Sequence, residues 1–382
     1  MTRHRQHEEE EWEHLTPDVG KEAKRGRKIA SATDRSKYKK TDQVKLKKQQ
    51  QEQGLAKIAG KTLRRGRILS ISPQAVTVDS EGVEFSCSMR GALKQEITRM
   101  KNLITVGDFV SFEAGVGQEG AIAHVEERRS MLARMDHFSK RKQQLIAANI
   151  DQVLITLSVL SPALKPFLAD RYIIAALKGN MTPILVINKI DFLKSPPGGI
   201  DKETLYQERL LYEEFCETYA ALDIPLFPVS CRTGQGLDEL KEVMQGKASV
   251  FSGQSGVGKS SLINVVTGLD LRTGDIRENV HKGAHTTSSA QLIPLSFGGW
   301  CIDTPGIRSF GMWDMQPEEV VKYFPEIDAL GHECHFPNCT HTHEPECAVL
   351  KALEKEEIGK LRYLSYQKLL EDLEGQRKLI FD

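Results

Sequence analysis

The sequence contains no long hydrophobic run. None of its apolar stretches reaches the roughly 18 residues that a membrane-spanning helix needs. Its first residues, MTRHRQHEEEEWEH, lack the apolar core of a secretory signal. A net charge is also absent, because 52 Lys and Arg balance 52 Asp and Glu in 382 residues. These absences argue against a membrane protein or a secreted protein, and the length indicates two or three globular domains.

Cysteine is scarce and unevenly placed. There are seven cysteines, and three of them lie within residues 334–347. An odd, clustered set in a chain without a signal sequence indicates a reducing compartment and a metal site rather than a disulfide framework. We therefore expect a cytoplasmic protein with no membrane partner.

The neutral total charge conceals a basic segment near the N-terminus. Residues 21–48 hold twelve Lys and Arg against three Asp and Glu, a net charge of +9 (12 − 3), with almost no large apolar residues. This composition predicts a disordered basic arm over 1–60. The arm is either a solvated tail or a contact for the RNA backbone.

Short β-rich runs separated by turn signals follow the arm. Five of them lie within residues 62–127: GRILSIS, AVTVDS, VEFSCSM, DFVSFEAG and AIAHVEE. The segments DSEG and VGQEG are typical of hairpin turns. We predict a small closed β-barrel over 61–128, with the OB-fold as the leading candidate and an SH3-like barrel as the alternative. The next segment, RRSMLARMDHFSKRKQQ, is expected to be a basic linker.

Strand-like and helix-like patterns alternate from Leu145 onward. The runs DQVLITLSV and TPILVINK are apolar almost throughout, as in strands buried within a parallel sheet. FLADRYIIAALKGN and ETLYQERLLYEEFCETYAAL have helical periodicity. The alternation predicts a doubly wound α/β domain, which we assign to 129–313. Residues 314–382 are expected to form a metal-binding, α-helical C-terminal domain.

A glycine-rich loop lies between a strand-like run and a helix-like run at 251–264. It fits the pattern G-x-x-x-x-G-K-[ST], in which backbone N–H groups surround phosphates. Lys259 brings a charge to the β- and γ-oxygens, the Ser260 hydroxyl ligates Mg²⁺, and the helix that follows adds its positive N-terminal end. The predicted phosphate-binding residues are Gly253, Gln254, Ser255, Gly256, Val257, Gly258, Lys259, Ser260 and Ser261.

A second motif, NKID at 188–191, follows the apolar strand PILVI and predicts guanine recognition. The Asp191 carboxylate can accept from the guanine N1 and N2 donors, Asn188 can meet the O6/N7 edge, and the Lys189 stem can cover the ring. Ile190 completes the motif. Ser230, at the end of PLFPVS, is expected to give a backbone contact to the same base. The expected ligands are therefore GTP and GDP.

Two further segments are expected near the γ-phosphate and Mg²⁺. DTPG follows the strand GGWCI, so that Asp303 can reach Mg²⁺ through water and Gly306 can present its N–H to the γ-phosphate. In the GAHTT segment, Thr286 is the favoured Mg²⁺ ligand and Thr287 the alternative.

Here the base-recognition residues precede the phosphate loop, the switch threonines and DTPG, whereas in an ordinary GTPase the phosphate loop comes first and the base-recognition residues come last. Joining the ends of such a domain and opening the chain before its base-recognition half preserves the pocket, because domain termini often lie close together. We therefore predict a circularly permuted GTPase domain. The segment after DTPG leads directly into the C-terminal region and can transmit the nucleotide state to it.

Near the C-terminus the pattern C-x4-C-x-H-x5-C predicts a closed tetrahedral Zn²⁺ site, without the open position of a catalytic metal. Its residues are Cys334, Cys339, His341 and Cys347. By spacing alone, three other histidines are alternative ligands: His332, His335 and His343. The charged sequence that follows predicts one or two helices, which serve either packing or interaction.

The permuted motif order, the barrel and the metal pattern together resemble the RsgA/YjeQ family of GTPases that depend on the small ribosomal subunit. The phosphate loop is GQSGVGKSS, the switch is GAHTT, and the likeness covers residues 62–370. The resemblance implies a bacterial or organellar factor in late maturation of that subunit, which binds its rRNA near the decoding region through the barrel and zinc domains. It implies weak hydrolysis accelerated by the subunit, and it implies that the four residues of the pattern ligate zinc.

The residue after the DTPG glycine is Ile307, where many GTPases have a glutamine that positions water. Isoleucine neither donates nor accepts a hydrogen bond, so slow intrinsic turnover is expected. The family resemblance nominates His285, which can orient or deprotonate water near neutral pH. The alternative is a loop histidine that contacts rRNA or the switch backbone. Arg308, as an internal arginine finger, is the weaker candidate.

Two functions follow from these motifs. The first is a GTPase that hydrolyses GTP to GDP as a timer for its release from the small subunit. The second is an rRNA-binding assembly or checkpoint factor in which GTP holds the binding shape and hydrolysis is incidental. Complete phosphate, Mg²⁺ and γ-phosphate motifs favour the first, and a P-loop small-molecule kinase is disfavoured because NKID selects guanine. We expect a monomer.

Overall fold

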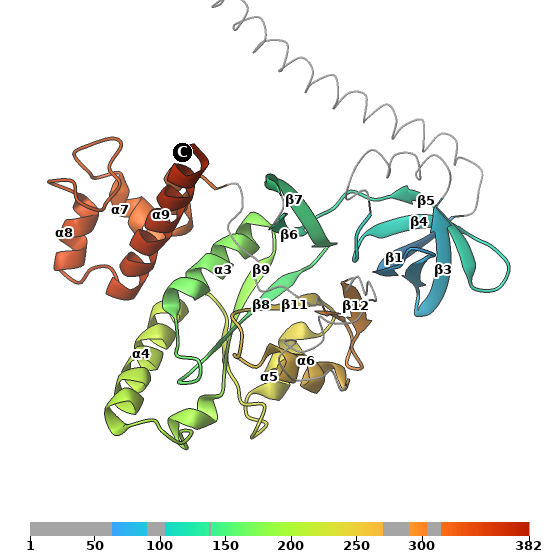
Figure 1. Cartoon of the computed structure of the whole chain (residues 1–382), viewed down its shortest axis with the longest axis horizontal. Helices are drawn as coiled ribbons and strands as arrows, with labels where there is room; N and C mark the ends of the chain where they lie inside the picture. The colour runs from blue at the N-terminus through green and yellow to red at the C-terminus, as the bar shows by residue number, and fades with distance from the viewer. Residues whose placement is uncertain (1–62, 90–103, 137–138, 270–289, 304–314, 382) are drawn as a thin grey trace, which may run out of the picture. The chain divides into compact units, whose positions relative to one another are not determined.

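The computed structural model describes residues 63–89, 104–136, 139–269, 290–303 and 315–381 (Figure 1). Residues Leu63–Asp382 form one compact unit. The basic arm predicted at 1–60 lies outside the described residues, as do the GAHTT segment and the part of DTPG after Asp303.

Five strands form a closed barrel, as predicted. They are β1 (Arg64–Ile71), β2 (Val76–Ser80), β3 (Val83–Met89), β4 (Phe109–Ala114) and β5 (Glu119–Val125). Their order is β1-β2-β3-β5-β4, with β4 pairing back to β1. Because β3 and β5 are parallel while the other pairs are antiparallel, the topology is a Greek key of the OB type. The DSEG turn has φ of 57° at Glu81 and 82° at Gly82, as a tight hairpin requires.

The prediction of a basic linker after the barrel was wrong. Strand β6 (Met131–Asp136) pairs antiparallel with β7 (Ser139–Ala148) as a two-stranded ribbon. The charged run SKRKQQ shows no alternation of apolar and polar residues, so periodicity could not identify it. Strand formation here depends on cross-strand pairing, which single-residue preference does not capture.

A six-stranded sheet forms the centre of the GTPase domain. Its strands are β8 (Gln152–Ser158), β9 (Thr182–Asn188), β10 (Leu226–Pro228), β11 (Ala248–Ser252), β12 (Gln291–Pro294) and β13 (Trp300–Asp303). The order is β10-β9-β8-β11-β13-β12, and every pair is parallel except β12 with β13. The chain proceeds outward from β8 to β10 and then returns to β11. The carboxyl ends of β8 and β11 therefore flank a topological switch point, where ligands bind in open α/β sheets.

Helices cover both faces of this sheet, as predicted for a doubly wound domain. They are α3 (Pro166–Lys178), α4 (Lys202–Ala220), α5 (Leu237–Met244) and α6 (Lys259–Thr267). In β8, Val153 and Ile155 pack with α3 and α4, whereas Leu154 packs with α5 and α6. This two-residue alternation explains why the strand is apolar on both sides and had to lie inside the sheet.

The C-terminal module has its own core. Its elements are a 3₁₀ helix η2 (Pro317–Tyr323), α7 (Pro325–Gly331), α8 (Ala348–Glu354) and α9 (Lys360–Phe381). Val320, Phe324 and Leu369 are fully buried in that core. Among the described residues, no helix combines the length and the apolar character needed to cross a bilayer.

Arg362 joins the C-terminal module to the GTPase domain. Its guanidinium pairs with the fully buried Asp170 of α3 and, at 2.7 Å, with Glu326 Oε1 of α7. Burial acts to lower the pKa of Arg362, but the two carboxylates raise it above its usual value. The charged group is thus held inside the protein by acceptors from two different elements.

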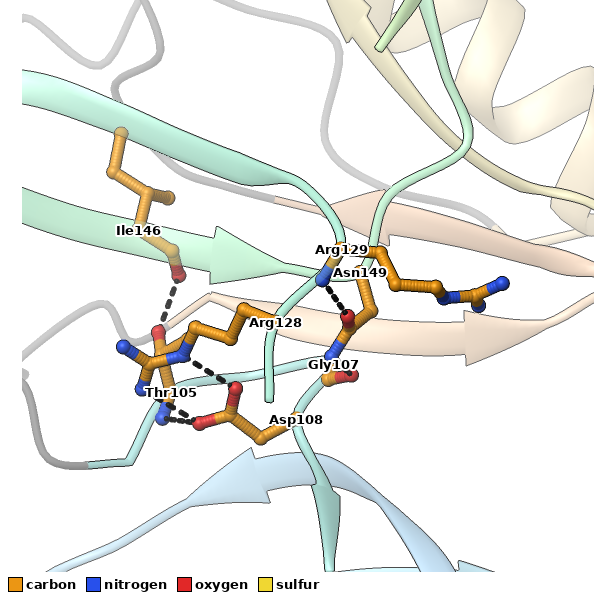
Figure 2. Close-up of polar contacts among 7 residues, drawn as sticks. All are labelled: Thr105, Gly107, Asp108, Arg128, Arg129, Ile146 and Asn149. Carbon is orange, nitrogen blue, oxygen red and sulfur yellow. Dashed lines mark hydrogen bonds and ion pairs between the residues drawn. The ribbon is translucent and has the colours of Figure 1, made fainter. Parts of the chain in front are cut away.

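A buried carboxylate joins the barrel to the segment that follows it (Figure 2). Asp108 is fully buried and accepts from Arg128 Nε at 2.7 Å and Nη2 at 2.9 Å. The same carboxylate accepts from the Thr105 backbone N–H at 2.7 Å, and Thr105 Oγ1 donates to the Ile146 carbonyl of β7 at 3.0 Å. The loop before β4 is thereby bonded to the β6–β7 ribbon.

Asn149 makes a second set of contacts beside this one (Figure 2). Its side chain accepts from Arg129 N at 2.9 Å and donates to the Gly107 carbonyl at 3.1 Å. The buried Arg67 of β1 donates to the Asn149 carbonyl at 2.5 Å, and burial lowers the pKa of Arg67 to about 10. The barrel is therefore linked by hydrogen bonds to the start of β8.

Candidate functional site

The phosphate-loop motif forms a tight turn between β11 and α6. Gly253, Gly256 and Gly258 have φ of 150°, 83° and 93°, which residues with a side chain rarely adopt. A Cβ at Gly253 would lie 2.1 Å from the Thr156 carbonyl oxygen of β8. Lys259 Nζ donates to the carbonyls of Gly253 at 2.8 Å and Gln254 at 2.6 Å, so its ammonium lies over the loop. This is the strand–loop–helix context that phosphate binding requires.

The NKID motif, 69 positions away, contacts this loop directly. Asn188 ends β9 and is buried, and its Nδ2 donates to the Val257 carbonyl at 2.9 Å. Lys189 Nζ donates to the Gly256 carbonyl at 2.6 Å. Burial lowers the pKa of Lys189, while Asp191 opposes that effect. Two segments in permuted order thus meet at the carboxyl edge of the sheet.

One carboxylate oxygen of Asp191 accepts no hydrogen bond from the part of the chain that the structure describes. Ser230 Oγ donates to Asp191 Oδ1 at 2.7 Å, and Ser230 Oγ in turn accepts from Thr233 N at 3.2 Å. Asp191 Oδ2 is buried and finds no hydrogen-bond partner among the described residues, although Arg232 Nη1 lies 3.9 Å away. A buried carboxylate oxygen of this kind needs a donor. The paired N1–H and N2–H donors of guanine fit it.

Other predicted nucleotide residues take different positions around this edge. Ser255 and Ser260 are exposed, whereas Val257 and Ile190 are buried in the core. The Ser230 N–H is bonded to the Gln235 carbonyl at 3.0 Å, so the side chain of Ser230 is the part that orients Asp191. Asp303 ends β13, where its backbone pairs with Gln291.

The remaining candidates for the Mg²⁺, γ-phosphate and water-positioning roles lie outside the described residues. They are His285, Thr286, Thr287, Gly306, Ile307 and Arg308.

Two residues of this region were missed at the sequence level. Ser161, in the loop after β8, accepts from Lys189 Nζ through its carbonyl at 2.6 Å. No motif marks a backbone carbonyl, so nothing in the sequence could have identified it. Arg232 follows Ser230 by two positions. A basic residue this near to a predicted base-contact residue could have been identified from the sequence.

Cys334, Cys339, His341 and Cys347 converge on one point, with their potential ligand atoms all within 4.8 Å of one another. Cys334 Sγ lies 3.4 Å from His341 Nδ1 and 3.7 Å from Cys347 Sγ, and Cys347 Sγ lies 3.6 Å from His341 Nδ1. Burial raises the pKa of the Cys339 thiol to about 12. Three thiols and an imidazole at these distances fit a tetrahedral metal ion. None of the other three histidines belongs to the group.

The backbone of the ligand loop is fixed from α9. Tyr363 OH donates to the His341 carbonyl at 2.9 Å and Tyr366 OH to the Thr340 carbonyl at 3.1 Å. His341 has φ of 59°, an uncommon value for a residue with a side chain. A cavity of about 580 Å³ lies alongside and is lined by Cys339 and His341.

Comparison with known proteins identifies relatives of this arrangement. Residues 125–313 match the family profile described as RsgA GTPase. The small ribosomal subunit biogenesis GTPase RsgA of Porphyromonas gingivalis is 38% identical over 304 residues, which cover 78% of this chain and 93% of the relative. The protein of the same name from Thermotoga maritima is 36% identical over 319 residues, covering 82% and 98%.

Solved structures agree with these relatives. The crystal structure of YjeQ from Thermotoga maritima matches with a TM-score of 0.64 at 35% identity, covering 82% of this chain and 99% of that chain. YloQ, described as a circularly permuted GTPase, matches with a TM-score of 0.61 at 28% identity, covering 82% and 96%.

Proposed function

Because the chain belongs to the RsgA GTPase family, we propose that it acts in late maturation of the small ribosomal subunit, hydrolysing GTP to GDP as a timer for its own release. The observation that carries the proposal is the contact between the two permuted halves, Asn188 Nδ2 to the Val257 carbonyl at 2.9 Å. That contact joins a guanine-recognition motif to a phosphate loop in a single pocket.

At the base end of this pocket, Asp191 Oδ2 accepts from guanine N1–H and N2–H. The lack of a hydrogen-bond donor to this buried oxygen among the described residues supports this role. Asn188 faces the O6/N7 edge, and Ser230 keeps the carboxylate oriented through its 2.7 Å bond. The Lys189 stem covers the ring. Adenine lacks the two donors in this arrangement, so the pocket selects guanosine nucleotides.

At the phosphate end, the backbone from Gly253 to Ser261 surrounds the phosphates, and the Lys259 ammonium moves from the loop carbonyls to the phosphate oxygens. Mg²⁺ fits the oxygen ligands Ser260 and Thr286, with Asp303 acting through water, and it would neutralise charge on the transferred phosphate. Gly306 contacts the γ-phosphate and His285 orients the attacking water. Ile307 cannot take over that task, so intrinsic hydrolysis is slow.

The structural metal is proposed to be Zn²⁺, held by Cys334, Cys339, His341 and Cys347. The geometry of the four side chains and their composition of three thiols and one imidazole support this assignment. A closed site of this kind supplies folding energy to the C-terminal module rather than chemistry.

We propose a division into a basic arm (1–60), a barrel domain (61–128), a GTPase domain (129–313) and a zinc-binding domain (314–382).

The protein is proposed to be a cytoplasmic monomer, and rRNA of the small subunit is its macromolecular ligand. On the barrel, the exposed Arg65 lies with its guanidinium carbon 4.4 Å from the centre of the Phe109 ring. Arginine beside an aromatic ring is suited to contact with phosphates and bases.

A single-turnover GTP assay with and without purified small subunits tests the proposal. We expect strong acceleration by the subunit, and retention on sedimenting subunits with a non-hydrolysable GTP analogue but not with GDP. Unchanged hydrolysis together with tight binding in the GTP form would instead support the second candidate, a checkpoint factor, which the arginine–aromatic surface of the barrel also suits. Equal retention with both nucleotides would refute the switch.

A further inference from the structure

Glu208 of α4 contacts the loop that joins β8 to α3. Its Oε2 accepts from the backbone N–H groups of Leu160 at 3.3 Å and Leu164 at 3.4 Å. This loop, residues 159–165, starts at the carboxyl end of β8, beside the strand that carries the phosphate loop. One carboxylate oxygen thus restrains the loop at two points, next to the proposed nucleotide pocket.

The restrained loop is strained. Leu160 has φ of 64°, in the left-handed region that bulky residues avoid. Residues in such conformations persist where the surrounding contacts enforce them, and they concentrate at functional sites. Here the Leu160 side chain is 8% exposed, and Ser158 Oγ donates to the Pro162 carbonyl at 2.7 Å. The loop therefore has a defined shape, and Glu208 is one of the groups that enforce it.

The shape of the loop determines where Lys189 lies. In the sequence, Ser161 lies between Leu160 and Leu164, the two residues whose N–H groups bond Glu208. The Ser161 carbonyl accepts from Lys189 Nζ at 2.6 Å. The same ammonium donates to the Gly256 carbonyl of the phosphate loop at 2.6 Å. The two carbonyls therefore accept two of the three ammonium hydrogens of Lys189 and fix where its side chain ends. A shift of Ser161 would move the lysine stem away from the position proposed to cover guanine.

We propose that Glu208 is a positioning residue for guanine recognition, holding the Ser161 carbonyl so that it fixes Lys189 between the β8–α3 loop and the phosphate loop. This inference rests on the proposed function, because it deepens the role of the same pocket. It concerns the base end, so it affects GTP and GDP equally. It leaves the hydrolysis of bound GTP unchanged.

The test measures the affinity for GTP and GDP together with kcat at saturating GTP. For Glu208→Ala we expect both dissociation constants to rise about three- to tenfold, the loss typical of an ordinary intramolecular hydrogen bond, with kcat unchanged. Glu208→Gln keeps an oxygen acceptor and is expected to bind close to wild type. Glu214→Ala, at an exposed position on the same helix, is the matched control and should bind as wild type.

A double-mutant cycle tests whether Glu208 affects nucleotide affinity through Lys189. In a Lys189→Met background the ammonium is gone, so adding Glu208→Ala should cause no further loss of affinity. A loss that persists in this background would overturn the proposal, as would wild-type affinity of Glu208→Ala or a fall in kcat alone.

If Glu208→Ala does not fold, as judged by circular dichroism, Glu208→Asp takes its place. Its carboxylate is one methylene shorter and cannot reach both N–H groups, so it should bind more weakly than Glu208→Gln, and the opposite order overturns the proposal. Failure of the wild-type protein to bind GTP would refute the proposed function instead.

Discussion

At the scale of single residues, close backbone contacts define the nucleotide pocket. Gly258 has φ of 93°, and a Cβ placed there would lie 2.3 Å from Asn188 Nδ2. The absence of a side chain is what permits Asn188 to bond the adjacent Val257 carbonyl. The glycine therefore serves both the turn of the loop and the junction of the two permuted halves.

Gly258→Ala should weaken GTP binding by about ten- to a hundredfold, because it combines backbone strain of roughly 1–3 kcal/mol with displacement of Asn188. Titration with a fluorescent guanine nucleotide measures the loss. Gly198→Ala is the matched control, since its Cβ would meet nothing within 4 Å. Equal affinity of the two variants would show that the close contact has no functional weight.

Residues that belong to a local sequence motif could be predicted from the sequence. Residues that matter because of where the fold places them were missed. The glycines of the phosphate loop were identified because local spacing restricts their types, whereas spacing left several histidines open in the metal cluster and the family resemblance chose among them. Arg67 and Asn149 were missed, because their bond spans 82 positions and depends on how the barrel meets the next domain. Ser161 acts through its backbone carbonyl, which any residue type could supply.

At the scale of elements, burial separates strong ion pairs from weak ones. Asp108 is fully buried and bonds Arg128, which is 21% exposed, whereas Arg65 and Glu126 form a similar bidentate pair with 64% and 30% exposure. Solvent screens the second pair, and the first acts in a lower dielectric. The two pairs have the same chemistry and different environments.

Asp108→Asn should lower the free energy of unfolding by about 2–3 kcal/mol, because it removes the charge that bonds two guanidinium nitrogens and weakens the acceptor for Thr105 N. Glu126→Gln, the exposed counterpart, should cost at most about 1 kcal/mol. Urea unfolding of both variants measures the difference. If the two costs are the same, the buried pair does not hold the barrel to the β6–β7 ribbon.

Which segments form strands and which form helices could largely be predicted from the sequence, with the β6–β7 ribbon as the exception. The strands of the barrel and of the central sheet were found from apolar runs and turn signals. The β6–β7 ribbon was missed because its sequence is charged and its strands are stabilised mainly by each other.

At the scale of the whole molecule, the C-terminal module has a hydrophobic core of its own, to which the GTPase domain contributes Ile174 of α3. Val320, Phe324 and Leu369 belong to it, and the metal cluster lies at its edge. The strands and helices that carry the pocket residues pack in the two clusters on either side of the central sheet. Arg362 and Asp170 are among the contacts that cross between the two parts.

Removal of the metal by a chelator should therefore unfold the module selectively. We expect faster hydrogen exchange in α8 and α9, with guanine nucleotide affinity retained, because the metal ligands contribute nothing to the pocket. Exchange measured by mass spectrometry, alongside nucleotide titration, follows both parts at once. Simultaneous loss of nucleotide binding would mean that the two cores unfold as one unit.

The proposed function depends on two distant segments of the chain forming one pocket that selects guanine through Asp191. The most direct measurement is competition by GTP, xanthosine triphosphate and ATP for the bound guanine nucleotide, in wild type and in Asp191→Asn. We predict that the preference for GTP over xanthosine triphosphate falls by at least about a hundredfold in the variant, because the donor–acceptor match at the base edge is altered. An unchanged order of preference would contradict the pocket described here.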